Sequence, residues 1–339
     1  MALLSGYTDP FVLDLPRVVS LAKTKTLENW AEQVRAGEAR AISRAVSAIE
    51  DRAPEAESLL KELFPYTGRA SRVGVTGAPG TGKSTLVDKL AAYYRSREKS
   101  VGIIAVDPSS PFTGGAILGD RIRMQGHASD EGIFIRSMAT RGYLGGLAQA
   151  TGDAALLLDA AGKDIVLIET VGVGQGEIEI VRLADCTLVV LVPGMGDDVQ
   201  SLKAGLMEIA NIFVINKSDR EGAERLEEQV RALLQLLPEQ DGWRPPLVRT
   251  VATENKGVDE LARQIDLFRE HVARSQDRRA RDVAYWKNWL VRLLERRVIE
   301  QVFAKGITEG ELEAIATQVA TRQKDPYSAV SEILSRSGH

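Results

Sequence analysis

Eight consecutive residues, 77–84, have the composition and spacing needed to hold the phosphate groups of a nucleotide. They fit the pattern G-x-x-x-x-G-K-[ST] and read Gly77-Ala78-Pro79-Gly80-Thr81-Gly82-Lys83-Ser84, with Thr85 directly after them. The glycines let the backbone curl so that several N–H groups point toward phosphate oxygens at the start of a helix. Lys83 is expected to reach the β- and γ-phosphates, and the Ser84 hydroxyl to bind Mg²⁺. Because an apolar run precedes this loop and helix-favouring residues follow it, the sequence predicts a nucleotide-binding site.

A second polar box follows the apolar run Ile212 to Ile215 and is suited to reading a purine base. It has the arrangement N-K-x-D and reads Asn216-Lys217-Ser218-Asp219. The Asp219 carboxylate can accept hydrogen bonds from N1–H and N2–H₂ of guanine, while the Asn216 amide can reach the O6/N7 edge. Adenine lacks this donor pair and would leave the carboxylate unpaired, so we expect GTP and GDP rather than ATP. Ala252, after the last predicted strand, is expected to approach guanine O6 through its backbone N–H.

Three carboxylates are candidates for the phosphate and metal chemistry. Glu169 ends an apolar run, where an acid helps to hold Mg²⁺ through its water shell, and the N–H of Gly172 is expected to approach the γ-phosphate. Asp107 comes directly after the second apolar run and would supply a further carboxylate near the metal. Asp120 lies in the Gly-rich segment that follows. For Asp107 and Asp120 the alternative is a role in capping a turn or a helix.

The residues after Gly172 bear on the rate of hydrolysis. Many signalling GTPases place a Gln that orients the attacking water at the next position, where this chain has Val173. We therefore expect slow intrinsic hydrolysis, with Gln175 able to replace that Gln only if the loop refolds. Gly174 and Gly176 lie in the same segment, which can therefore rearrange when the γ-phosphate leaves.

Strand-like apolar runs alternate with helical segments from Arg72 onward. The runs expected to be strands are Val73–Thr76, Val101–Val106, Ile133–Arg136, Ile165–Glu169, Thr187–Val192, Ile212–Asn216 and Leu247–Val251. Several are continuous blocks of β-branched residues, as expected in a parallel sheet with both faces covered. The alternation predicts an α/β fold with a doubly wound, mostly parallel sheet and ligands bound outside the carboxyl ends of its strands.

Helical patterns flank this predicted domain on both sides. Apolar residues recur at helical spacing from Leu27 to Ile49, with a break at Gly37. From Asp282 to Phe303 a long amphipathic pattern contains two tryptophans, and it either packs on the chain's own nucleotide domain or forms a dimer arm. We therefore expect an N-terminal helical extension (1–68), a P-loop GTPase domain (69–272) and a C-terminal helical dimerisation arm (273–339).

Composition narrows the class of protein. The chain has 339 residues, 44% of them hydrophobic and 27% charged, as in an ordinary globular protein. Its net charge of −4 argues against a nucleic-acid partner. The single cysteine, Cys186, suits a reducing compartment and is expected to be a buried structural thiol. No apolar run reaches membrane-spanning length and no targeting pattern opens the sequence, so no membrane association and a cytoplasmic location are expected.

Several of these segments together resemble the MeaB/ArgK family, to which the human methylmalonic aciduria type A protein belongs. The resemblance extends from about Leu27 to the C-terminal helices, and Asp107-Pro108-Ser109-Ser110 and the Glu169–Gln175 box are specific to the family. The segments that carry it are Gly77–Ser84, Val106–Pro111, Gly114–Met124, Glu169–Gln175 and Lys203–Gly205.

The resemblance implies a G-protein chaperone of a cobalamin-dependent acyl-CoA mutase. It implies a homodimer linked by C-terminal helical arms, and a GTPase cycle that gates adenosylcobalamin loading and protects the mutase from inactivation. On the family pattern, a third switch corresponds to Pro193–Lys203. Lys83 and Ser84 would hold phosphate and metal, Asp107, Asp120 and Glu169 would act around Mg²⁺, and Asn216, Lys217 and Asp219 would read guanine.

Two other classes use the same phosphate loop. One is a P-loop kinase or ATPase that acts on a small molecule or a transport protein. The base box, Asn216–Asp219, argues against this class because it is suited to guanine. The other is a metal-inserting GTPase such as a nickel chaperone, which the absence of a Cys/His cluster from the sequence disfavours.

Overall fold

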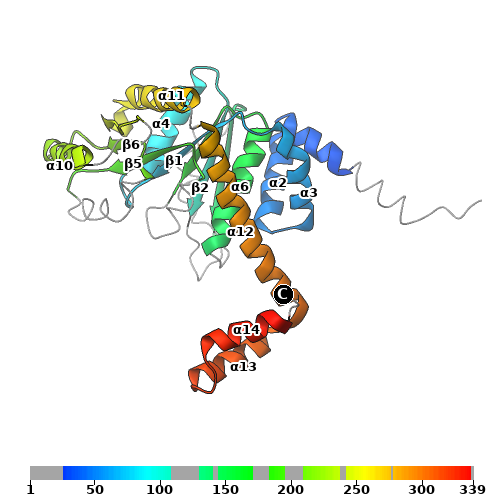
Figure 1. The fold of residues 1–339 in the computed structure, drawn as a ribbon. Helices are drawn as coiled ribbons and strands as arrows, with labels where there is room; N and C mark the ends of the chain where they lie inside the picture. The colour runs from blue at the N-terminus through cyan, green and yellow to red at the C-terminus, as the bar shows by residue number, and fades with distance from the viewer. Residues whose placement is uncertain are drawn as a thin grey trace, which may run out of the picture. The chain divides into compact units, whose positions relative to one another are not determined.

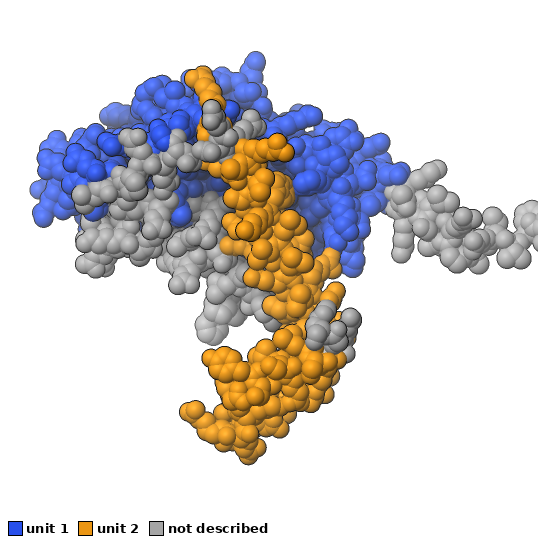
Figure 2. Space-filling view, viewed as in Figure 1, with its two compact units in different colours: residues 1–273 blue, residues 274–339 orange. Residues whose placement is uncertain are grey.

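The structure of the protein is a computed structural model, and it describes residues 26–107, 130–139, 144–170, 183–194, 209–236, 242–275 and 278–336. Contacts divide the chain into two compact units, residues 1–273 and 274–339, which Figure 2 colours separately. The first unit contains the sheet and the phosphate loop. Within the described residues, no helix is both long and apolar enough to cross a membrane.

A seven-stranded sheet forms the centre of the first unit (Figure 1). Its order is β3-β2-β4-β1-β5-β6-β7, and neighbouring strands are parallel throughout. The strands are β1 (Ser71–Thr76), β2 (Val101–Asp107), β3 (Ile133–Ala139), β4 (Ile165–Glu169), β5 (Cys186–Leu191), β6 (Ile212–Ile215) and β7 (Leu247–Arg249). The doubly wound α/β prediction is confirmed, and each predicted strand is present with small differences at its ends. Continuous apolar runs form these strands because helices cover both faces of the sheet.

The strand order brings the predicted nucleotide-binding segments to one edge. β1 is central, with β4 on one side and β5 on the other, although β2 follows β1 in the sequence. In this register Val75 of β1 pairs with Glu169 of β4. Since all the strands run the same way, the loops after β1, β4 and β6 leave the same edge of the sheet.

One face of the sheet is covered by the N-terminal helices and α6 (Leu144–Ala160). Residues 26–35 are helical and are followed by α2 (Ala39–Glu50) and α3 (Pro54–Leu63), which confirms the predicted helices and the break at Gly37. α2 and α3 both contact α6, beside which they lie in Figure 1. Their apolar side chains share one buried cluster with Ile104 and Val166 of the sheet. Farther along the sheet, α10 (Ala223–Leu236) covers Val189 and Phe213.

The opposite face of the sheet carries α4 (Lys83–Arg95) and α11 (Val258–Arg274). Leu86 of α4 and Phe268 of α11 pack in one cluster with Val75 and Cys186 of the sheet. Cys186 is 0% exposed, which confirms the predicted buried thiol, and burial raises its pKa.

The second unit consists of α12 (Arg278–Gly306), α13 (Glu309–Ala320) and α14 (Pro326–Arg336). The long amphipathic pattern of the sequence therefore lies within one helix, α12. A capping box starts α13: the Thr308 hydroxyl accepts from the Glu311 N–H, and the Glu311 carboxylate accepts from the Thr308 N–H. Ile307, Ile315 and Ala329 form the small buried core of this unit.

Candidate functional site

The phosphate loop lies between the end of β1 at Thr76 and the start of α4 at Lys83. Two of its glycines are required by the local geometry. A Cβ on Gly77 would lie 2.2 Å from the carbonyl oxygen of Val190, so the loop passes directly against β5. Gly82 precedes α4 with a φ of +89°, a left-handed conformation that glycine adopts without strain. The loop therefore leads directly into the N-terminus of α4, and a helix N-terminus favours the binding of an anion.

Lys83 is held over the loop by the loop's own backbone. Its Nζ donates to the carbonyl oxygens of Gly77, at 2.6 Å, and Ala78, at 3.1 Å. The Thr81 hydroxyl also donates to the Ala78 carbonyl, at 2.9 Å. Lys83 is 5% exposed, so its charge is buried beside the first turn of α4. Phosphate oxygens arriving at this loop would offer the ammonium group stronger acceptors than these carbonyls.

Ser84, in the first turn of α4, meets Glu169 at the end of β4. The Ser84 hydroxyl donates to Glu169 Oε1 at 2.5 Å, although 85 residues separate the two in sequence. Glu169 is 6% exposed at the end of β4. A hydroxyl and a carboxylate beside a phosphate loop are hard oxygen donors, the kind that Mg²⁺ prefers together with water and substrate phosphates. The two side chains therefore fit the metal that was predicted for them.

Asn216 joins the base box to the phosphate loop. Its Nδ2 donates to the carbonyl oxygen of Thr81 at 2.8 Å. Its Oδ1 accepts from the Thr250 hydroxyl and from the Ala252 N–H, both at 3.1 Å. Asn216 is 2% exposed and Thr250 is 1% exposed, so this is a buried polar junction of three loops. Thr250 was not among the residues predicted from the sequence, although a threonine directly after the last strand and before Val251-Ala252 is the signal for it.

Lys217 makes a second bridge between the same two loops. Its Nζ donates to the carbonyl oxygen of Gly80 at 2.7 Å, and its φ of +55° lies in the left-handed region. A Cβ on Gly82 would lie 2.5 Å from Asn216 Nδ2, so a glycine is also needed where the box meets the loop. Asp219, two residues farther on, is exposed. The sequence-predicted phosphate and base segments are thus adjacent in space.

Several predicted site residues lie outside the described part of the chain. They are Asp120, Gly172 and Gln175, the side chain of Asp107, and residues 195–203 of the predicted third switch. Among the described residues, no group of three or more His, Cys, Asp or Glu side chains is placed to hold a metal ion.

Comparison with known proteins agrees with this geometry. The family model described as methylmalonyl Co-A mutase-associated GTPase MeaB matches residues 39–307. A Pyrococcus abyssi protein named as a GTPase is 49% identical over 317 residues, covering 91% of this chain and 96% of the relative. GTPase ArgK of Escherichia coli is 39% identical over 293 residues, covering 82% of this chain and 87% of the relative.

Two further similarities also extend over most of the chain. The mitochondrial methylmalonic aciduria type A homolog of Caenorhabditis elegans is 32% identical over 303 residues, covering 84% of this chain and 74% of the relative. A crystal structure described as LAO/AO transport system kinase superimposes with a TM-score of 0.69 at 28% identity, covering 91% of this chain and 96% of that one. With a phosphate loop joined to a base box and a family match over most of its length, the chain belongs to the MeaB family of methylmalonyl-CoA mutase-associated GTPases.

Proposed function

We propose that this GTPase is a chaperone of a cobalamin-dependent acyl-CoA mutase, methylmalonyl-CoA mutase or a close relative. In this proposal its GTP cycle gates adenosylcobalamin loading and protects or reactivates the mutase in the cytoplasm. The description of the family model names a mutase, and a relative is named for methylmalonic aciduria. The observation that carries the nucleotide part is the Asn216 junction, because it connects base reading to the phosphate loop.

Lys83, Ser84 and Glu169 carry the phosphate chemistry in this proposal. Lys83 would exchange the carbonyls of Gly77 and Ala78 for the β- and γ-phosphates. Ser84 and Glu169, with Asp107 and Asp120, would hold Mg²⁺, whose charge offsets that of the phosphates when it is bound. Gln175 is proposed to orient the attacking water after a loop rearrangement, so intrinsic hydrolysis is slow and the mutase accelerates it.

Guanine recognition follows from the groups around Asn216. The Asn216 amide nitrogen has two N–H bonds and uses one for Thr81, so the other can face the O6/N7 edge of the base. Asp219 is exposed and can pair with N1–H and N2–H₂ of guanine. The Ala252 N–H, which donates to Asn216 Oδ1, would turn toward O6 when the base binds.

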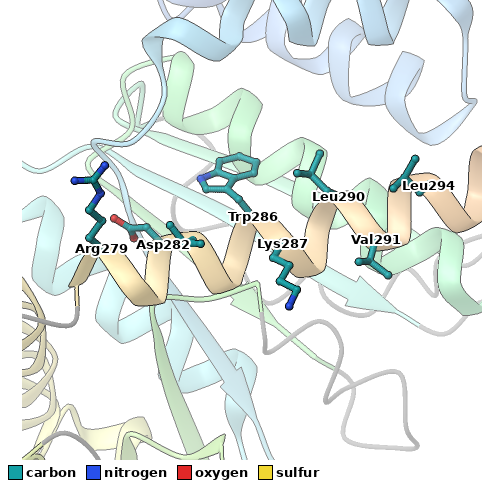
Figure 3. A pocket seen from close by; sticks show the side chains of 8 residues that line it. Arg279, Asp282, Trp286, Lys287, Leu290, Val291 and Leu294 are labelled. Carbon is teal, nitrogen blue, oxygen red and sulfur yellow. The ribbon is translucent and has the colours of Figure 1, made fainter.

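A homodimer is the second part of the proposal. In the second unit, Val283, Leu290 and Leu294 of α12 are 60%, 55% and 63% exposed, and with Trp286 they line a pocket along the helix. Figure 3 shows Trp286, Leu290 and Leu294 on the same side of α12. Contiguous apolar surface of this kind is usually covered in a globular protein. A second copy of α12 would cover it symmetrically. The molar mass measured by light scattering should correspond to two chains, and the mass of one chain at micromolar concentration would contradict this part.

The chaperone role is tested with purified mutases. The rate of GTP hydrolysis should rise when the client mutase is added, and the client should co-purify with the chain from its host. A control protein with the same CoA substrate but no cobalamin should leave the rate unchanged. If every cobalamin-dependent mutase of the host leaves the rate unchanged, the chaperone proposal is wrong while the GTPase assignment stands.

A kinase or ATPase acting on a small molecule or transport protein is the alternative function. The description of the superimposed crystal structure, a transport system kinase, favours it. The base box argues against it, because Asp219 has no donor pair to bind on adenine. Parallel titrations with GTP and ATP decide between the two, since preferential ATP binding would exclude the guanine-reading role.

A further inference from the structure

Two buried hydroxyl groups are bonded to each other at the nucleotide edge of the sheet, and none of the roles above uses them. Thr76 is the last residue of β1, and Thr170 comes directly after β4. The Thr170 hydroxyl donates to the Thr76 hydroxyl at 3.1 Å, and the Val75 carbonyl oxygen is a second, more distant acceptor at 3.5 Å. Thr76 is 0% exposed and Thr170 is 1% exposed, so neither hydroxyl faces water.

This side-chain bond adds to a backbone bond that already joins the two strands. The Thr170 N–H donates to the carbonyl oxygen of Val75 at 3.0 Å, which continues the β1–β4 ladder one residue beyond β4. Valine has nearly the same shape as threonine and would fill the same space without a polar group. A buried hydroxyl, in contrast, is unfavourable unless it keeps its hydrogen-bond partner. Packing alone therefore gives no reason for this pair of threonines.

Each threonine is the direct neighbour of a residue that contacts the site. Thr76 precedes Gly77, whose carbonyl accepts from Lys83. Thr170 follows Glu169, whose carboxylate accepts from Ser84. The bond between the hydroxyls therefore fixes the end of β1 relative to the end of β4 at the place where Ser84 and Glu169 must meet.

We propose that Thr170 is a positioning residue for the GTPase reaction. Through Thr76 its hydroxyl holds the end of β4 so that Glu169 stays within reach of Ser84, and it thereby sets the affinity of the nucleotide site for Mg²⁺. This inference rests on the Mg²⁺ role proposed for Ser84 and Glu169. Thr170 itself acts through Glu169 and contacts neither the nucleotide nor the metal.

The test compares Thr170→Val, which removes the hydroxyl, with Thr170→Ser, which keeps it. The dissociation constant of GDP is measured by calorimetry with Mg²⁺ and with EDTA, and the Mg²⁺ concentration that gives half-maximal GTP hydrolysis is measured in parallel. Because Thr170→Val loses a hydrogen bond, the Mg²⁺ concentration that gives half-maximal GTP hydrolysis should rise by about five-fold in this variant. The ratio of the GDP dissociation constants in EDTA and in Mg²⁺ should fall by a similar factor. GDP affinity in EDTA should not change, and Thr170→Ser should behave as wild type.

Thr187→Val is the matched control. Thr187 is a buried threonine of β5, 4% exposed, near the start of that strand rather than at its carboxyl end. Its Mg²⁺ dependence should equal that of wild type. If Thr170→Val also keeps the wild-type dependence, or if Thr170→Ser loses it to the same extent as Thr170→Val, the positioning role is wrong.

Thr76→Val reaches the same bond from the other side and serves if Thr170→Val does not fold. Thr76→Val removes the acceptor of the bond from Thr170, so it should raise the Mg²⁺ requirement in the same direction as Thr170→Val. An unchanged Mg²⁺ dependence in a folded Thr76→Val variant would contradict the proposal. Glu169→Gln tests the Mg²⁺ role of Glu169 separately. If Glu169→Gln leaves the Mg²⁺ dependence unchanged, the metal role of Glu169 is wrong and this inference with it. If Glu169→Gln changes the Mg²⁺ dependence and Thr170→Val does not, only the inference is wrong.

Discussion

A buried lysine lies at each end of the parallel strands, and the two lysines have different surroundings. At the carboxyl edge Lys83 is 5% exposed and donates to two carbonyls of the phosphate loop. At the amino edge Lys163 is 7% exposed and donates to the Gly132 carbonyl at 3.2 Å. Burial and the nearby charge of Arg95 lower the pKa of Lys163, while Asp130 and Asp164 act in the opposite direction.

The surroundings of the two lysines explain the difference. Near Lys163, Arg95 makes a bidentate pair with Asp130 at 2.9 and 2.8 Å. Asp164 accepts hydrogen bonds from Ser100 and Lys99. The charged groups around Lys163 are therefore paired with one another. Lys83 donates to two neutral carbonyls of the phosphate loop, which a phosphate can replace. The two lysines thus differ in their surroundings: Lys83 donates to carbonyls of the phosphate loop, at the predicted ligand site, whereas Lys163 lies among charges that are already matched within the protein.

The largest expected effect is the loss of hydrolysis in Lys83→Ala. Without the ammonium group the site loses a charge aimed at the phosphates, and GTP hydrolysis should fall by about 100-fold or more. Single-turnover hydrolysis and GTP binding measure this. The matched control is Lys163→Met, which should lower the melting temperature and leave the GTPase rate within about two-fold of wild type, since it alters only packing at the far edge. Equal losses of activity in both variants would contradict the contrast between the two edges.

The second effect concerns selectivity for the base. Asp219→Asn should weaken GTP binding by about 100-fold, because the new amide places a donor against the N–H groups of guanine, and should improve binding of xanthosine triphosphate. Competition titrations with the two nucleotides measure this. Asp185→Asn, which alters an acid paired with Arg72 at the amino edge, is the control and should keep the wild-type preference. Retained guanine preference in Asp219→Asn would remove the base-reading role.

The third effect is on stability alone. Asp159 is 5% exposed and accepts from three consecutive N–H groups, those of Gly68, Arg69 and Ala70, just before β1. Asp159→Ala leaves these donors without their acceptor and should lower the free energy of unfolding by about 3 kcal/mol. Urea unfolding measures it, and Asp159→Asn, which keeps one acceptor oxygen, should lose less. GTP affinity at temperatures where the variant is folded should be unchanged, and weakened binding would show that the amino edge is coupled to the site.

The sequence predicted the parts of this comparison that depend on local pattern. Apolar blocks such as Ile165–Glu169 identify strands because a short, continuously apolar run is typical of a strand that is buried on both faces. The phosphate loop Gly77–Ser84 is recognised from its residue pattern alone. The Thr250–Asn216 and Thr76–Thr170 contacts were not predicted, because they depend on which strands are neighbours. β4 lies between β1 and β2, and the order of the chain does not give that arrangement. Long-range pairing therefore decides which polar residues at strand ends meet.

The smallest expected effect is a pH dependence confined to the amino edge. Burial would raise the pKa of Asp164, but hydrogen bonds from the Ser100 N–H and hydroxyl and from Lys99 outweigh it, so the pKa lies below its ordinary value of 3.8. A carboxylate with a lowered pKa in the folded state stabilises the protein above its unfolded pKa, and that stability is lost as the pH falls through the folded pKa. Asp164→Asn should therefore be slightly less stable than wild type at pH 7, and the difference should shrink as the pH falls below 3.8 toward the lower pKa of the folded state. Thermal unfolding from pH 7 to pH 3 measures this, and a difference that does not change with pH would show that packing, rather than charge, is what Asp164 contributes.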